Sequence, residues 1–262
     1  MTSLEHGTEA GPLVIARRKL LLRLVEVYFA DELKDPHVSG DLVVFLQAST
    51  GGERCVPFHT LHLDLANDAD RLWAEFSKTT QYEIRRGESR DGCAFSTPRP
   101  PSLGDIDEFA RFYDGFARTV GVPRCNTTKL RSLNRCGALV ISHVADIHGA
   151  PLAFHVYIVT ARRARLLYSA SARHAAGSPA ERAAVGRANR ALHWMDIQTF
   201  QGQAMAIYDF GGLALTDDPR LQAIDAFKQG FGGKAVREYN CYLPRTLFGR
   251  VALAYLGRRA RR

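Results

Sequence analysis

The chain has 262 residues, of which 46% are hydrophobic and 24% charged, a composition typical of a soluble globular protein with a sizeable core and not of a disordered chain. Its formal net charge of +8 favours anionic partners such as RNA, phosphorylated substrates, nucleotide cofactors or anionic lipid, although solubility alone explains the charge equally well. No apolar run reaches the roughly 18 residues of a membrane-spanning helix, and the polar, acidic first residues are not those of a signal peptide. We therefore expect a cytoplasmic protein.

The five cysteines and nine histidines show no pattern of a metal site or of a disulfide framework. The cysteines are odd in number and widely spaced, and no Cys-x-x-Cys occurs, which predicts a reducing compartment and argues against disulfides and zinc knuckles. His59 and His62 lie three residues apart in an extended run, where their side chains point to opposite faces. We predict no metal site.

Residues 1–12 are expected to be loose, and residues 13–96 to form a smaller N-terminal lobe that is rich in strands. Asn67 or Asp68 is a plausible N-cap for the helical part of this lobe, which we expect in two pieces. The expected elements are strands at 20–30, 41–48 and 60–65, helix over 67–87, and a short strand at 93–96.

The main domain is expected to span residues 97–243, after a stiff proline-rich connector at 97–104. Three consecutive strands in its middle are typical of an antiparallel meander. The expected elements are helices over 105–120 and 126–135, strands at 138–145, 152–160 and 166–171, a long helix over 180–201, a strand at 205–209, a helix over 219–230 and a strand at 235–243.

This order of elements is similar to that of the GNAT acyltransferase fold, and three segments narrow the resemblance. The segments at 186–194 (GRANRALHW), 208–212 (YDFGG) and 227–233 (FKQGFGG) resemble the Fem-type branch of that superfamily. The resemblance implies an α/β (α+β) fold with a mixed central sheet flanked by helices, beside the smaller N-terminal partial lobe. It also implies a transferase that moves an amino acid from aminoacyl-tRNA to an amine, as in peptidoglycan cross-bridge building, without a tightly bound cofactor.

Three residues are candidates for the chemistry of acyl transfer, which needs a deprotonated amine and donors for the oxyanion. Lys228 follows Phe227 and lies close in sequence to a glycine pair. The Fem resemblance implies that the lysine of the Phe-Lys pair holds a phosphate or the tetrahedral oxyanion. Asp209 ends a strand just before two glycines, where it can orient or deprotonate the amine, or cap the turn. His193 is suited to proton shuttling near neutral pH, although packing against a core stripe is the plainer reading.

Substrate contacts are expected around these three residues. Asn189, His193 and Asp196 are spaced i, i+4 and i+7, so they share one side of the long helix. Arg187 lies on another side of that helix, where it can meet a phosphate or remain a solvated charge. The predicted substrate-binding residues are Phe227, Tyr168, Arg187, Asn189, Gly211, Gly212 and Gly232.

The last segment, residues 244–262, combines apolar side chains with six arginines and no acidic residue. Such a tail can lie on an anionic membrane, track RNA phosphates, or pack as a terminal helix with a basic end.

Three functions therefore stay open. The first is a Fem-like aminoacyltransferase acting on a small or envelope-related amine. The second is an N-acyltransferase that uses acyl-CoA or an acyl-carrier protein, although residues 171–179 lack the usual glycine-rich pyrophosphate loop. The third is a non-catalytic module that binds RNA or membrane through its basic surface. A peripheral position at the inner membrane face is the alternative to a purely cytoplasmic location.

Overall fold

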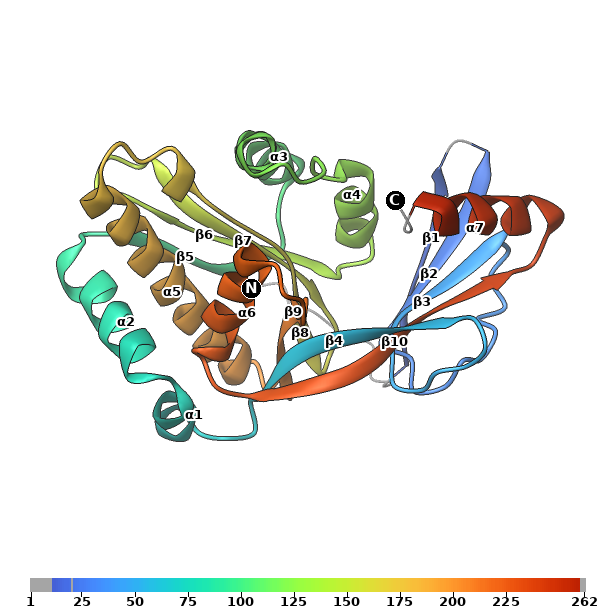
Figure 1. Cartoon of the computed structure of the whole chain (residues 1–262), viewed down its shortest axis with the longest axis horizontal. Coiled ribbons are helices and arrows are strands. Elements are labelled where there is room, and N and C mark those ends of the chain that lie inside the picture. The colour runs from blue at the N-terminus through green and yellow to red at the C-terminus, as the bar shows by residue number, and fades with distance from the viewer. Residues whose placement is uncertain (1–10, 20, 260–262) are drawn as a thin grey trace. The chain divides into compact units, whose positions relative to one another are not determined.

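The computed structural model describes residues 11–19 and 21–259, and its chain forms two compact units (Figure 1). The first unit comprises Met1–Thr60 and Ala235–Arg262, and the second comprises Leu61–Lys234. The main boundary expected near residue 97 therefore lies inside the second unit, because the strand before it pairs with the strand that begins at Leu139. The chain passes between the units twice, at residues 60–61 and 234–235. Of the expected loose segment at 1–12, residues 1–10 lie outside the described chain.

The first unit is built on strands in the order β1-β2-β3-β10. Strand β1 pairs antiparallel with β2, β2 runs parallel to β3, and β3 pairs antiparallel with β10. The sequence predicted only one strand where β1 and β2 form a hairpin. The bounds are β1 Leu13–Lys19, β2 Leu22–Tyr28, β3 Leu42–Ala48 and β10 Lys234–Pro244, with helix α7 over Leu247–Arg259.

Successive side chains of β2 and β3 point to opposite faces of the sheet, and both faces are apolar in this unit. One face holds a cluster of Val25, Val27, Ala30, Val43, Phe45, Ala48 and Cys241. The other face holds Leu22, Leu24, Leu42 and Val44, against which Ala252 of α7 packs. Helix α7 approaches closely at Gly249, where an added Cβ would lie 2.0 Å from the carbonyl oxygen of Asp41. The expected terminal helix is therefore present, and residues 260–262 of the expected tail lie outside the described chain.

A disulfide between Cys55 and Cys241 corrects the expectation that the cysteines form no bridges. The two residues are 186 apart in sequence, and both belong to the first unit. Strand β4 (Cys55–Asp64) begins at the first of them. The other cysteines, Cys93, Cys125 and Cys136, are free. The pairing of Cys55 with Cys241 could not be predicted from the spacing of the cysteines. A bridge between two strands of a sheet needs spatial proximity and leaves no local sequence pattern.

The second unit contains strands in the order β4-β9-β8-β7-β6-β5. The strands β5 to β8 pair antiparallel in succession, which confirms the predicted meander. Strands β8 and β9 instead run parallel, and their register covers Arg163↔Ile207 to Arg165↔Asp209. The bounds are β5 Ala94–Arg99, β6 Leu139–Ala145, β7 Pro151–Val159, β8 Arg163–Ser171 and β9 Ile207–Gly212.

Helices cover both faces of this sheet, and polar side chains cap most of them. Ser77 caps α2, which explains why the helical stretch is broken after Phe76, and Ser102 starts α3 with a capping box. Asn126 caps α4 as predicted. The bounds are α1 Ala69–Glu75, α2 Lys78–Arg90, α3 Leu103–Val120, α4 Thr127–Arg135, a short turn η1 at Ala172–His174, α5 Pro179–Gly202 and α6 Pro219–Gln229.

Strand β7 shows which helix covers which face. Phe154 packs against Phe109 of α3, whereas the next residue, His155, bonds to Asp196 of α5. Successive strand residues point to opposite faces, so α3 and α5 lie on opposite sides of the sheet, with α2 alongside α5 (Figure 1). The main core of the unit lies on the α5 side and contains Tyr157, Trp194, Phe200, Tyr208, Phe210 and Phe231, among others.

Candidate functional site

The candidate site lies on the α5 side of the second unit, where α5 and α6 bring three predicted residues together. The ring centroids of His193 and Phe227 are 5.6 Å apart. The guanidinium of Arg190 lies over the Phe227 ring, with its carbon 4.7 Å from the centroid. Lys228 lies beside Phe227, and its Nζ donates a hydrogen bond of 2.5 Å to the carbonyl oxygen of Gly212. We call His193, Phe227 and Lys228 the His193 cluster.

Helix α6 is held in this place by Asp225, which is buried. Its carboxylate accepts hydrogen bonds of 3.0 to 3.1 Å from the backbone N–H groups of Ala214 and Leu215, just after β9 ends. One turn of helix separates Asp225 from Lys228. The loop after β9 and the lysine are therefore fixed by the same helix.

The electrostatic surroundings of Lys228 are mixed. Burial lowers the pKa of Lys228 below its ordinary value, and the charge of Asp225 partly opposes this. The nearby Arg165 lowers the pKa further. The lysine is only partly exposed, so its interaction with a neighbouring anion is less screened than that of a surface lysine.

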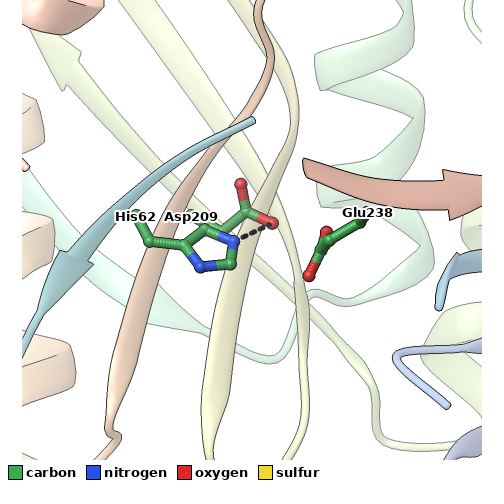
Figure 2. Close-up of side chains that lie close together, drawn as sticks. All are labelled: His62, Asp209 and Glu238. Atoms are coloured by element: carbon green, nitrogen blue, oxygen red, sulfur yellow. Dashed lines mark ion pairs between the residues drawn. The ribbon is translucent and has the colours of Figure 1, made fainter. Parts of the chain in front are cut away.

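Asp209 is fully buried and serves as an anchor between strands. Its Oδ2 accepts hydrogen bonds from Arg163 Nη2 at 2.5 Å and Nε at 3.0 Å, and its Oδ1 accepts one from the backbone N–H of Gly211 at 2.8 Å. His62 Nε2 lies 3.8 Å from Oδ2 (Figure 2). Burial raises the pKa of Asp209, but contacts with His62 and Arg163 more than offset this, and its net pKa lies well below its usual range. Such a carboxylate is better suited to positioning than to accepting a proton.

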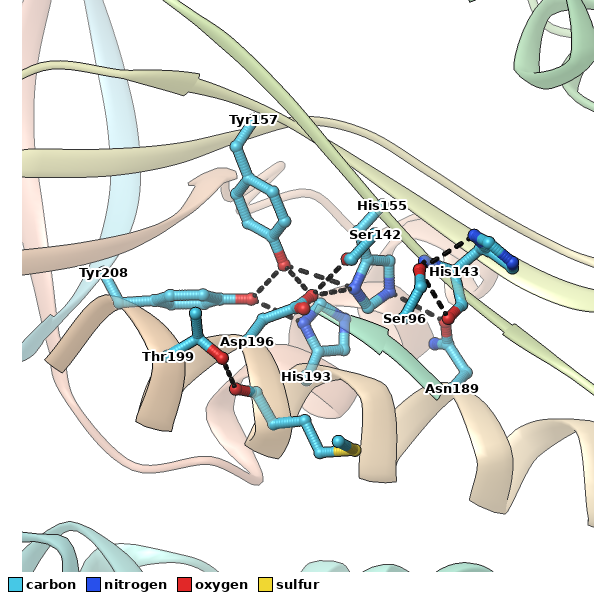
Figure 3. Close-up of polar contacts among 11 residues, drawn as sticks. Ser96, Ser142, His143, His155, Tyr157, Asn189, His193, Asp196, Thr199 and Tyr208 are labelled. Atoms are coloured by element: carbon cyan, nitrogen blue, oxygen red, sulfur yellow. Dashed lines mark hydrogen bonds and ion pairs between the residues drawn. The ribbon is translucent and has the colours of Figure 1, made fainter. Parts of the chain in front are cut away.

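A buried polar network joins α5 to the sheet beneath the His193 cluster (Figure 3). Asp196 Oδ2 accepts from three groups: the hydroxyl of Ser142 at 2.9 Å, Nδ1 of His155 at 2.8 Å and the hydroxyl of Tyr157 at 2.6 Å. The Tyr157 and Tyr208 hydroxyl oxygens are 2.8 Å apart. The Tyr208 oxygen in turn lies 2.7 Å from Nδ1 of His193. A continuous path of hydrogen bonds thus links Asp196 to His193.

The network continues to Asn189, which confirms that the i, i+4 and i+7 residues of α5 share one side. Asn189 Oδ1 lies 3.0 Å from Nε2 of His155, and the rings of His155 and His193 are close, with centroids 3.9 Å apart. Asn189 therefore bonds within the protein. Its predicted substrate contact remains a proposal.

Burial sets the protonation of the aromatic members of this network. It raises the pKa of both Tyr157 and Tyr208, and the neighbouring Asp196 raises it further, so both hydroxyls keep their protons. Burial lowers the pKa of His193 well below its ordinary value, and the charges of His155, Lys228 and Arg190 add to the effect. His193 is therefore neutral at pH 7, as a proton acceptor must be.

Two predicted substrate contacts lie away from the His193 cluster. The Tyr168 ring packs against Tyr113 of α3 at 4.7 Å, and its hydroxyl accepts the N–H of Asn126, which places it on the opposite face of the sheet. Arg187 forms a two-point ion pair with Asp91 at 2.7 and 2.9 Å. That pair joins α5 to the end of α2, so Arg187 has a structural partner already.

The glycines at this site lack a side chain, which allows two backbone segments to lie in close contact. Gly211 has a φ of +71°, and an added Cβ would lie 2.8 Å from the carbonyl oxygen of Leu166. Gly232 has a φ of +73°, and its Cβ would lie 2.9 Å from the Glu75 carbonyl oxygen. Gly212 instead offers its carbonyl to Lys228. The predicted closeness of these glycines to a ligand stays a proposal, whereas their closeness to neighbouring chain is part of the fold.

We expect Gly211→Ala to destabilise the protein by about 1–3 kcal/mol, because the new side chain needs a left-handed backbone and meets Leu166. Gly186→Ala is the matched control. Gly186 lies in α5, where an added Cβ has only an ordinary contact at 3.8 Å, so we expect stabilisation of about 0.5–1 kcal/mol. Urea unfolding of both variants measures the difference, and equal effects would contradict this account of Gly211.

Several residues of the site were not predicted as site residues: Ser142, His155, Tyr157, Arg163, Asp196 and Tyr208. One signal was available, since His155 and Tyr157 alternate along one strand and so share a face. Their partner Asp196 was placed beside Asn189 and His193 by helical spacing alone. The pairing of these two groups depends on how α5 crosses the sheet, which no local pattern encodes.

A small pocket of about 20 Å³ lies on the α3 side of the same unit. Ser96 and His143 form one wall, with Oγ of Ser96 2.8 Å from Nδ1 of His143 (Figure 3). Its lining consists of Ser96, Arg99, Pro101, Asp105, Glu108, Ile141, His143 and Phe154. The volume suits about one water molecule, and none of the predicted site residues lines it.

In the part of the chain that the structure describes, no helix is long and apolar enough to cross a membrane. No family model matches the sequence, and no curated protein matches it.

Solved structures, in contrast, share the fold. The C-terminal domain of a putative lysylphosphatidylglycerol synthetase from Agrobacterium fabrum is 17% identical with a TM-score of 0.57, over 93% of this chain and 84% of that one. FemX is 10% identical with a TM-score of 0.61, over 92% and 87%. L-PGS from Bacillus licheniformis is 14% identical with a TM-score of 0.52, over 95% and 86%. The chain therefore has the Fem-like GNAT fold that its sequence predicted.

Proposed function

We propose that this protein is a transferase that moves an activated aminoacyl or acyl group onto a nucleophile, in the first instance an amine. The observation that supports it most is the His193 cluster, in which a neutral buried histidine packs against Phe227 and the charge of the next residue, the partly buried Lys228, acts on that histidine. Acyl transfer needs a base that accepts the proton of the acceptor and a cation that stabilises the oxyanion. The fold shared with FemX and with a lysylphosphatidylglycerol synthetase domain supports the same reaction class.

In the proposed reaction, the acceptor gives its proton to Nε2 of His193 while its lone pair attacks the carbonyl carbon of the donor ester. The carbonyl electrons move to oxygen, where the ammonium of Lys228 offsets the new negative charge. When the tetrahedral intermediate collapses, the carbonyl re-forms and the donor oxygen leaves with the proton from His193. Asp209 holds β9 in place through its bonds to Arg163 and Gly211. The stacked side chains of Phe227 and Arg190 line the proposed site beside His193.

Aminoacyl-tRNA is the donor we favour, because the segments at 186–194, 208–212 and 227–233 resemble the Fem-type branch. The net charge of +8 suits a polyanionic donor. An acyl-CoA or an acyl-carrier protein is the alternative donor, and neither requires a tightly bound cofactor.

Native mass spectrometry of the purified protein with charged tRNA, uncharged tRNA and a panel of acyl-CoAs tests the donor. Selective retention of charged tRNA supports the favoured donor, and release of labelled amino acid onto an added amine then tests the transfer itself. Retention of an acyl-CoA alone would indicate that the donor is an acyl-CoA and not aminoacyl-tRNA. Salt-sensitive RNA binding that survives loss of Lys228, without any transfer, would instead indicate a non-catalytic module.

Helix α7 favours a peripheral contact with anionic lipid. One side of it packs on the sheet through Ala252, while Leu247, Phe248, Val251 and Tyr255 are between 46% and 76% exposed. Spacings of three and four residues place these side chains on one stripe. Arg250 is exposed beside them, and the sequence continues with four further arginines. An apolar stripe with basic neighbours is suited to a lipid interface, and so a phospholipid is the second candidate acceptor.

The double variant Leu247→Ser/Val251→Ser is expected to lose most of the binding to vesicles of phosphatidylcholine with phosphatidylglycerol, because both side chains supply apolar area to the interface. The matched control is Leu215→Ser/Ile224→Ser, which removes two exposed apolar side chains of the second unit. Vesicle sedimentation measures binding, and vesicles without phosphatidylglycerol should bind weakly. Equal binding by both double variants would contradict a lipid contact through α7.

A further inference from the structure

The buried path from Asp196 to His193 has a defined direction, because each hydroxyl in it has only one proton to give. Tyr157 lies 2.6 Å from Asp196 Oδ2, and a carboxylate oxygen can only accept. Tyr157 therefore donates to Asp196. The alternative acceptor for its proton, Nδ1 of His155 at 3.2 Å, is itself bonded to the same carboxylate oxygen.

The next two contacts follow from the first. The oxygens of Tyr157 and Tyr208 are 2.8 Å apart, so one proton must lie between them. Since Tyr157 has given its proton to Asp196, that proton belongs to Tyr208. Tyr208 then has only lone pairs for His193, and Nδ1 of His193, 2.7 Å away, must be the protonated nitrogen.

We propose that Asp196, Tyr157 and Tyr208 are positioning residues that fix His193 as its Nδ1–H tautomer, leaving Nε2 as the basic nitrogen. This inference rests on the proposed function, in which Nε2 takes the proton of the acceptor. No hydrogen bond to Nε2 occurs among the described residues. The aromatic rings around His193, those of Phe210, Phe227 and Phe231 with centroids 5.2 to 5.6 Å away, offer no competing acceptor or donor.

The groups around His193 do not reverse this assignment. On its own helix, Asn189 and Asp196 are engaged with His155, and Arg190 lies over Phe227. From the sheet, Tyr208 bonds to Nδ1, and the His155 ring lies 3.9 Å away, centroid to centroid. From α6, Lys228 bonds to Gly212. Among the described residues, the contact with Tyr208 is the only hydrogen bond made by a ring nitrogen of His193.

Nuclear magnetic resonance of protein with ¹⁵N-labelled imidazole rings tests the tautomer without any substrate. The spectrum of the His193→Gln variant identifies the His193 signals by their loss. We expect the wild-type protein at pH 7 to show Nδ1 protonated and Nε2 unprotonated. The opposite pattern in the wild type would overturn the proposal directly.

Two variants test the path itself. Tyr157→Phe removes the acceptor of the Tyr208 proton, so Tyr208 can donate to Nδ1 and His193 should change to the Nε2–H tautomer. Tyr208→Phe removes the hydrogen-bond partner of Nδ1 altogether and should also weaken the preference of His193 for the Nδ1–H tautomer. Ser142→Ala is the matched control, because it removes a buried hydrogen bond to the same Asp196 oxygen outside the path. We expect the tautomer of that variant to be unchanged.

The same variants separate this inference from the proposed function. If the protein transfers an acyl group, Tyr157→Phe should lower the transfer rate constant by about 10²-fold, the low end for loss of general-base catalysis. A wild-type Nδ1–H tautomer that persists in both tyrosine variants would overturn the positioning role. The expected tautomers in a protein without transferase activity would support the positioning role and count against the proposed function.

Discussion

Replacing Lys228 with methionine is expected to lower the rate constant of the transfer step by about 10²–10³-fold, the usual effect of removing one donor from an oxyanion site. The lysine is partly buried beside Phe227 and bonded to the Gly212 carbonyl, so its charge acts in a medium of low dielectric constant. Methionine keeps most of the side-chain volume and removes the charge. Single-turnover transfer with the donor identified by mass spectrometry measures the effect.

The kinetic form of the loss separates two roles of Lys228. A lower kcat with an unchanged KM indicates that the lysine stabilises the transition state, whereas a higher KM with an unchanged kcat indicates that it binds a phosphate of the donor. Lys234→Met is the control, because Lys234 is an exposed lysine six residues further on. If both variants transferred as fast as the wild type, Lys228 would have no part in the reaction.

Much of the fold could be predicted because its signals are local. The N-caps at Asp68 and Asn126 and the meander of three strands all appear in the structure close to their predicted residues. Helical spacing also placed Asn189, His193 and Asp196 correctly on one side of α5.

What could not be predicted depends on contacts between distant segments. The bonds of Asp196 to Tyr157 and to Ser142 join residues 39 and 54 apart, and they exist only because α5 crosses β6 and β7 at one particular place. The Cys55–Cys241 bridge spans 186 residues. The division into two units likewise depends on β10, which returns to the first unit and pairs with β3. No change in composition along the chain marks this return.

Arg163→Met is expected to destabilise the protein by about 3–5 kcal/mol at pH 7, because it leaves the carboxylate of Asp209 buried without its cation. Asp209 is 0% exposed, and Arg163 bonds to it through two nitrogens. Arg162→Met is the control, since Arg162 is the exposed neighbour of Arg163 and should change stability little. Urea unfolding of both variants measures the free energies.

The pH dependence of this loss follows from the direction of the Asp209 pKa. In the wild type the folded pKa is far below the unfolded value of about 3.9, so the carboxylate stabilises the fold above that pH and loses its contribution as pH falls towards the folded pKa. Loss of Arg163 removes one of the contacts that lower the folded pKa of Asp209, while burial, which raises it, remains and His62 and Arg165 still lower it. Asp209 therefore takes up a proton at a higher pH than in the wild type, which relieves part of the penalty. The penalty should therefore shrink from pH 7 to pH 4.5, and the double variant Arg163→Met/Asp209→Asn should be more stable than Arg163→Met at pH 7. A penalty that stays constant over this range would show that the loss arises from packing and not from the buried charge.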